Sequence, residues 1–151
     1  MKTVSKLVIV AGVIAIALSG LVVNAQTSNG KINVSELPAA AQAFIKEHFI
    51  SQTVVSVTAD KDLSGTEYDV VLSGGTTLEF DGNGSWEEID GNKTALPATV
   101  VPKAIVDYTA QNYAGKAVVQ IDKDKNGFDV ELADNTELEF DANGKFIRVD
   151  N

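Results

Sequence analysis

An internal repeat is the feature that most constrains the fold of this chain. Residues 68–90 align without a gap on residues 128–150, sixty positions later. Further upstream, after a shift of four residues, Leu37 and Pro38 fall on Val101 and Pro102. The repeat predicts two similar units. The positions of the first copy that recur unchanged in the second are Asp69, Val70, Leu72, Thr76, Leu78, Glu79, Phe80, Asp81, Asn83, Gly84 and Asp90.

Periodicity within one unit predicts one helix followed by four strands. Apolar residues recur at helical spacing from Leu37 to His48, and Pro38 suits the first turn of a helix. Alternating β-branched runs then follow at 54–58, 68–72, 76–80 and 86–90, separated by Gly and Asn turn signals. A unit of this size buries little surface alone. We therefore predict an α+β fold of two tandem repeats, each one helix plus a four-stranded antiparallel meander, docked into one saddle-like sheet with helices on one face.

The first 25 residues have the pattern of a signal peptide. Lys2 and Lys6 precede an apolar run from Leu7 to Leu18, and Ala25 ends a suitable cleavage site. A membrane anchor is the alternative, but the run is shorter than the roughly 20 residues of a bilayer span. We expect a periplasmic or secreted protein without a stable membrane anchor, organised as signal peptide 1–25, linker 26–34, first repeat 35–91 and second repeat 92–151.

Composition excludes several classes of function. The chain has 12 basic and 21 acidic residues, for a net charge of −9, which becomes −11 once residues 1–25 are removed. Such a chain is repelled by a phosphate backbone, so a nucleic-acid partner is not expected. The sequence has no cysteine and a single histidine, His48, so thiolate chemistry and cysteine-based metal sites are impossible. We expect no cofactor, no dedicated metal site and no enzymatic activity.

Strand alternation predicts that the sheet face opposite the helices is open, acidic and marked by one large aromatic residue in each repeat. An aromatic ring within a charged rim is typical of a protein interface. The alternative for the two aromatic residues is a β-bulge that turns them inward, against the helices. The candidate partner-binding residues are Trp86, Phe146, Glu79, Glu88, Glu137, Glu139 and Arg148.

Other patterns resemble known sites more weakly. Residues 122–127 resemble the first half of a calcium-binding loop, but Ala133 stands where that loop needs a bidentate Glu. Asp81 with Asn83, and Asp141 with Asn143, are typical of tight hairpin turns. Paired carboxylates on an open strand lack the water-excluding pocket that acid–base catalysis needs. His48 at a helix end is best explained by the helix dipole.

The order of helix, four strands and closing [IV]-D, with the hairpin pattern F-D-x-N-G-x-[WF] present twice, resembles the PepSY-like tandem-repeat proteins of exported Bacteroidetes proteomes. Their fold is similar to the beta-lactamase inhibitory protein, in which two helix-plus-sheet repeats form one saddle-like sheet. The resemblance covers about residues 35 to 151 and implies an exported binding or inhibitor-type module. It transfers no active site, no disulfide and no inhibitory loop residue.

These observations predict an exported, non-enzymatic module that binds a protein or peptide through its open acidic face, in the manner of an inhibitor. The alternative is an acidic protein that binds a divalent cation or another cationic ligand. A third class, a purely structural surface component, fits the same composition.

Overall fold

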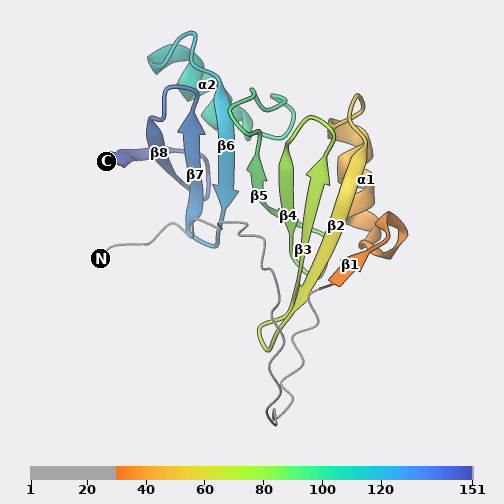
Figure 1. Cartoon of the computed structure of the whole chain (residues 1–151). Coiled ribbons are helices and arrows are strands. Elements are labelled where there is room, and N and C mark those ends of the chain that lie inside the picture. The colour runs from red at the N-terminus through yellow and green to blue at the C-terminus, as the bar shows by residue number, and fades with distance from the viewer. Residues whose placement is uncertain (1–29, 151) are drawn as a thin grey trace, which may run out of the picture.

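The computed structural model describes residues 30–150, so the predicted signal peptide lies outside the described residues. These described residues form nine strands, two α-helices and one 3-10 turn, arranged as in Figure 1. In chain order they are β1 (Gly30–Ile32), η1 (Val34–Glu36), α1 (Ala39–His48), β2 (Val54–Lys61), β3 (Thr66–Leu72), β4 (Thr77–Phe80), β5 (Trp86–Asp90), α2 (Lys103–Asn112), β6 (Val118–Lys123), β7 (Gly127–Leu132), β8 (Glu137–Asp141) and β9 (Phe146–Asp150).

All nine strands belong to one antiparallel sheet whose spatial order follows the chain from β1 to β9. The predicted fold class of two docked repeats, each with one helix and a four-stranded meander, is wrong. β5 pairs directly with β6, through Ile89 opposite Ile121, so the sheet runs through the middle of the chain without a break. A ninth strand, β1, lies in the stretch expected to be linker. The described chain is therefore mostly β, with two helices of ten residues each.

Each helix begins directly after a proline. Pro38 precedes α1 and Pro102 precedes α2, because a fixed φ suits a helix start and the missing N–H costs nothing there. Before α1, the backbone N–H of Asn33 donates to Glu36 Oε2 over 2.8 Å and caps the short turn η1. Within residues 30–150 no helix is long and apolar enough to cross a membrane.

The core lies between the helices and one face of the sheet, and it is a single cluster. Phe80 and Phe140 are fully buried, as are the facing helix residues Ala41 and Ile105. The alternation that predicted the helix-facing side is confirmed for most strand positions. Val55 is an exception, because a register shift between Val54 and Ser56 leaves it 65% exposed.

Two β-bulges change which way the strands face near their starts. The pairing of β4 with β5 shifts register between Glu79 and Phe80, and the pairing of β8 with β9 shifts between Glu139 and Phe140. As a result Trp86 lies opposite Phe80, and Phe146 lies opposite Phe140. Both aromatic side chains are thereby placed on the side of the sheet that the helices cover.

Gly127 of β7 lies opposite Asp141 of β8 with no room for a side chain, so it offers a test of this packing. A Cβ added there would be 1.9 Å from the carbonyl oxygen of Phe140. We expect Gly127→Ala to lower the free energy of unfolding by about 1–3 kcal/mol or more, since overpacking forces the backbone to move. Gly30→Ala is the control, because nothing lies within 4 Å of its added Cβ. Equal urea midpoints for the two variants would contradict the close packing.

Candidate functional site

Six carboxylates stand side by side across the open face, the sheet face opposite the helices. The strand registers place each directly opposite the next, from β3 to β8. Beyond one end the same register continues to Thr58 and Lys31, and beyond the other to Arg148. We call this set the carboxylate row: Asp69, Glu79, Glu88, Asp122, Asp129 and Glu139.

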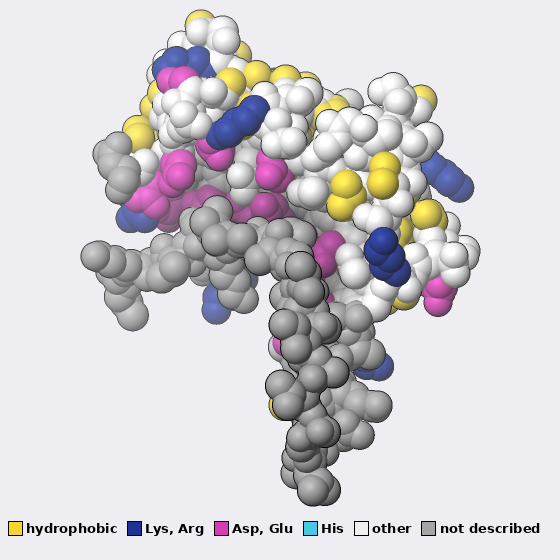
Figure 2. Space-filling view, viewed as in Figure 1, with side chains coloured by type: hydrophobic (Ala, Val, Ile, Leu, Met, Phe, Trp, Pro, Cys, Tyr) yellow, Lys and Arg dark blue, Asp and Glu magenta, His cyan; other side chains and the backbone are white. Residues whose placement is uncertain are grey.

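The row crosses the strands rather than running along one of them. Neighbouring strands lie about 4.8 Å apart, so the four inner carboxylates of the row each have a like charge one strand away on both sides, and the two end ones have it on one side. Figure 2 shows the acidic side chains gathered on this face, with basic side chains mostly toward its edges. Like charges at this spacing repel, so the row is suited to attract cations.

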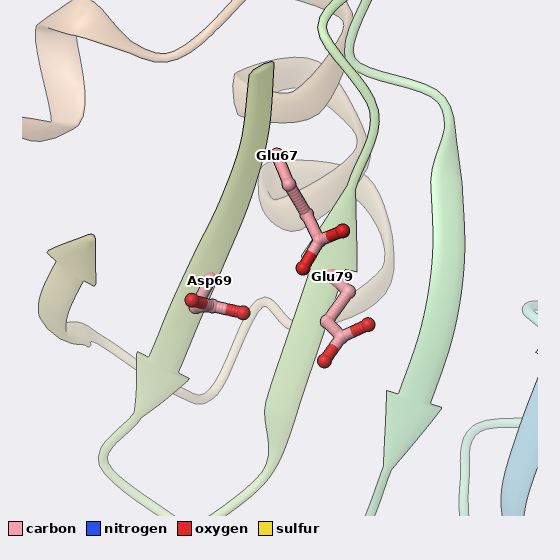
Figure 3. A group of neighbouring side chains, drawn as sticks. All are labelled: Glu67, Asp69 and Glu79. Carbon is pink, nitrogen blue, oxygen red and sulfur yellow. The ribbon is translucent and has the colours of Figure 1, made fainter. Parts of the chain in front are cut away.

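The β2–β4 end of the row carries the densest group of carboxylates, shown in Figure 3. Glu67, Asp69 and Glu79 each offer an oxygen, and these oxygens lie within 4.8 Å of one another. Burial and the neighbouring Glu67 and Asp69 charges raise the pKa of Glu79 from 4.5 to about 7. Burial and the Asp60 charge also raise the pKa of Asp69. Asp60, opposite Glu67, has a buried Oδ1 with no hydrogen-bond partner among the described residues.

In the middle of the row, Glu88 and Asp122 face each other where β5 meets β6. Gln120 Nε2 donates to Glu88 Oε1 over 2.9 Å and to Asp122 Oδ2 over 3.3 Å. Burial first, and the Asp122 charge second, raise the pKa of Glu88. Burial also raises the pKa of Asp122. Both carboxyl groups therefore hold a proton more tightly than they would in water.

The β7–β9 end of the row has a different charge balance. Asp129 and Glu139 occupy the positions sixty residues after Asp69 and Glu79, but the residue after the same interval from Glu67 is Gly127. Arg148 replaces the acidic residue of the first half, and its Nη2 lies 2.5 Å from Glu139 Oε2. This end is therefore partly neutralised, and the close backbone at Gly127 leaves no room for a third carboxylate.

The rings of Trp86 and Phe146 do not stand on the open face. Trp86 packs near Phe44 of α1 with ring centroids 6.5 Å apart, and Phe146 stacks on Tyr108 of α2 at 4.6 Å. The β-bulges described above produce this inward placement. Lys123 Nζ lies 4.4 Å from the centroid of the Trp86 ring. Of the seven predicted binding residues, the structure brings Glu79, Glu88, Glu139 and Arg148 into one line.

Glu137, the remaining predicted residue, is exposed on the open face two residues before Glu139 on β8. It lies outside the carboxylate row, between Glu131 of β7 and Asp150 of β9. Sequence reasoning missed Glu67 and Asp122 as parts of the acidic site. Asp122 was considered only within a calcium-loop pattern, because nothing in a single sequence states which residue of one strand lies opposite which residue of the next. The alternation of Glu67 with Asp69 along β3 was the available signal for Glu67.

The aspartates of the hairpin turns are used by the backbone. Asp141 Oδ1 accepts hydrogen bonds from the backbone N–H groups of Lys145 at 2.9 Å and Asn143 at 2.8 Å, which lower the pKa of Asp141. Asp124 Oδ1 likewise accepts from the N–H of Asn126 at 2.7 Å. The turn interpretation of these motifs is confirmed. His48 lies in the last turn of α1, and its Nδ1 is 3.0 Å from Thr99 Oγ1.

The raised pKa values predict that the protein loses stability as the pH rises toward 8. The pKa of Glu79 is about 7 in the folded protein against an ordinary 4.5, so the folded state holds this proton more tightly than the unfolded chain. The resulting stabilisation is complete below pH 4.5 and is lost as the pH rises through about 7. Differential scanning calorimetry at low ionic strength should show a melting temperature that falls from about pH 5 to about pH 8.

Glu79→Gln should flatten this pH dependence, because an amide cannot ionise. Glu47→Gln is the matched control: Glu47 is exposed on α1, away from the open face, and the same change should leave the slope unaltered. A melting temperature that does not depend on pH over this range, or equal slopes for both variants, would count against the electrostatic description of the row.

Three solved structures are similar to this chain over most of their length. A "putative calcium-regulated periplasmic protein" from Bacteroides thetaiotaomicron is 36% identical, with a TM-score of 0.78 over 82% of this chain and 97% of that one. A "putative periplasmic protein from DUF2874 family" from Bacteroides vulgatus is 37% identical, with a TM-score of 0.77 over 82% and 98%. A further periplasmic protein "of unknown function" from the same species is 36% identical, with a TM-score of 0.76 over 81% and 100%.

No curated protein matches the chain. The family model described as "Putative beta-lactamase-inhibitor-like, PepSY-like" matches residues 66–148, which contain the whole carboxylate row. That match covers more than half of the sequence, and it includes both hairpins in which the F-D-x-N-G-x-[WF] pattern occurs. The chain belongs to the PepSY-like, beta-lactamase-inhibitor-like family.

Proposed function

We propose that the β2–β4 end of the carboxylate row binds a divalent cation, with calcium as the ion it fits. The observation that carries the proposal is the convergence of Glu67, Asp69 and Glu79, whose oxygens lie within 4.8 Å of one another. Calcium is held by carboxylate oxygens at about 2.3–2.6 Å, so one ion can bridge oxygens up to roughly 5 Å apart. The buried Oδ1 of Asp60 lies beside this group as a further oxygen.

The electrostatics of the site support a cation-dependent role. Ionisation of Glu79 near pH 7 is opposed by its carboxylate neighbours, and a bound dication would remove that opposition. Protons and the metal ion therefore compete for the same oxygens. Cation binding should stabilise the fold most at the pH values where the unoccupied row destabilises it.

The comparisons agree with this proposal in two respects. One similar structure is described as calcium-regulated, and all three are described as periplasmic. We infer that this chain is exported to the same compartment after removal of residues 1–25. The family description names no enzymatic activity, and we propose a binding role without catalysis.

A second candidate function is binding of a basic protein or peptide segment across the full carboxylate row. The observation that favours it is the length of the row, which continues over β5 to β8, beyond the reach of one ion. In this role Glu88, Glu137, Glu139 and Arg148 would contact the partner, and an inhibitor-like action would follow if that partner were an enzyme. Trp86 and Phe146 would support the row from behind the sheet.

Isothermal titration calorimetry of residues 26–151 with calcium chloride at low salt, near pH 8, tests the first proposal. We expect saturable binding that Glu79→Gln weakens by about tenfold or more, since one charged ligand is lost. Glu139→Gln is the matched control, because it makes the same change sixty residues later at a carboxylate held by Arg148. It should leave calcium binding nearly unchanged.

Silence at millimolar calcium would contradict the cation site. A lysine octapeptide titrated in the same cell then distinguishes the second candidate. Saturable binding of the peptide that both Glu79→Gln and Glu139→Gln weaken would assign the whole row to a basic partner.

A further inference from the structure

The outer edge of β9 is an exposed edge of the sheet, where another strand could pair. β9 is the last strand in the sheet order, and its recorded pairing is with β8 on the other side. Ile147 and Val149 on this strand are 51% and 38% exposed. In the part of the chain that the structure describes, no strand pairs with this edge, and such an edge strand with exposed apolar side chains is a template for another strand.

The corresponding edge of the first half, that of β5, is covered by β6. β5 contains Ile89, which occupies the position sixty residues before Val149 and is fully buried. Ile89 is buried because β6 pairs alongside β5 and places Ile121 directly opposite. Val149 sits opposite Leu138 on its inner side in the same way that Ile89 sits opposite Leu78. Among residues 30–150, no strand stands beside Val149 as β6, with Ile121, stands beside Ile89.

We propose that β9 pairs antiparallel with β9 of a second copy of this chain, about a two-fold axis that passes at Val149. The two Val149 side chains then meet across the axis on the helix side of the sheet. Such an interface uses the same patch on both copies, as closed dimers require. It joins two nine-stranded sheets edge to edge.

Charge complementarity fixes this register. With Val149 at the axis, Arg148 of each copy lies opposite Asp150 of the other, on the open face. Shifting the axis to Arg148 would place two arginines opposite each other, and shifting it to Asp150 would place two aspartates together. An axis placed between two residues would change the pairing register by one residue. It is excluded because it would set side chains that point to opposite faces of the sheet opposite each other.

The side chains of Arg148 and Asp150 are accessible for contacts with a second copy. Arg148 and Asp150 have half-exposed side chains, at 55% and 50%, and within one chain Arg148 Nη2 lies 3.8 Å from Asp150 Oδ2. Arg148 therefore holds Asp150 only loosely, while its closer contact is Glu139. A second Asp150 across the axis would give the guanidinium group another carboxylate to bind.

The pairing of β5 with β6 is an internal precedent for the proposed one. Opposite Glu88, Ile89 and Asp90 stand Asp122, Ile121 and Gln120. In the dimer, the residues opposite Arg148, Val149 and Asp150 are Asp150, Val149 and Arg148 of the second copy. On the opposing strand, the order of acid, β-branched residue and polar or basic residue is the same in both cases. The charges differ at one pair, because Glu88 stands opposite an acid and Arg148 would stand opposite Asp150.

The net charge of −11 on each copy of residues 26–151 opposes association, and the paired edge is short. The dimer should therefore be weak and should strengthen when salt screens the overall repulsion, with a Debye length of about 8 Å at physiological ionic strength. Sedimentation velocity of residues 26–151 from micromolar to millimolar concentration, at physiological salt, measures it. We expect a reversible monomer–dimer equilibrium with no larger species.

Two charge reversals provide the decisive experiment. Arg148→Asp and Asp150→Arg should each abolish the homodimer, because each places like charges across the axis. An equimolar mixture of the two variants should form a heterodimer, since every crossing pair is then opposite in charge. Lys125→Asp is the control: it makes the same charge change as Arg148→Asp, but in the turn between β6 and β7, and should still dimerise.

Several outcomes would overturn the proposal. A monomer at all concentrations would do so, as would dimers that survive both charge reversals. Larger assemblies that Lys31→Asp disrupts would indicate head-to-tail pairing of β9 with β1 instead. If Arg148→Asp does not fold, as judged by circular dichroism, Asp150→Arg and Asp150→Lys alone still test the register.

Discussion

The direct pairing of β5 with β6 is the contact on which the rest of the structure depends. Ile89 opposite Ile121 buries the junction on the helix side, and the same register sets Glu88 opposite Asp122 on the other side. Because this pairing exists, the residues of the two halves share one core and one open face. Without it, the carboxylates of β3 and β4 would form a group separate from those of β7 and β8, and no continuous row would exist.

The two faces of the sheet carry opposite kinds of side chain at the same level of the strands, charged on one and apolar on the other. Directly behind the carboxylate row runs a series of large side chains that includes Tyr68, Phe80 and Phe140, packed toward the helices. Burial of these rings supplies a hydrophobic stabilisation large enough to hold like charges together on the front. The bulges beside Phe80 and Phe140 add Trp86 and Phe146 to the same layer. Electrostatic repulsion on one face is thus offset by hydrophobic packing on the other.

Sequence reasoning was most reliable where one residue's neighbours along the chain decide its environment. The alternation of Val70, Leu72 and Leu78 predicted their burial, and Asp141 was predicted as a turn aspartate. It failed where pairing between distant segments decides. Three residues, Gly30–Ile32, are too few to show a strand period, so β1 was expected to be linker. The inward turn of Trp86 depends on one extra residue in a bulge, which alternation alone leaves open, and the alignment of Asp122 with Glu88 depends on register.

The position of Trp86 has a practical meaning for optical work on this protein. It is the only tryptophan in the sequence, and it lies between Phe44 of α1 and Phe128 of β7, with the Lys123 ammonium over its ring. The indole emission of the chain therefore originates from one place, on the reverse side of the strand that carries Glu88. The ammonium group is held over the indole face by attraction to the negative face of the ring. Trp86 thus serves as a natural fluorophore at the junction of the two halves, and no label has to be introduced there.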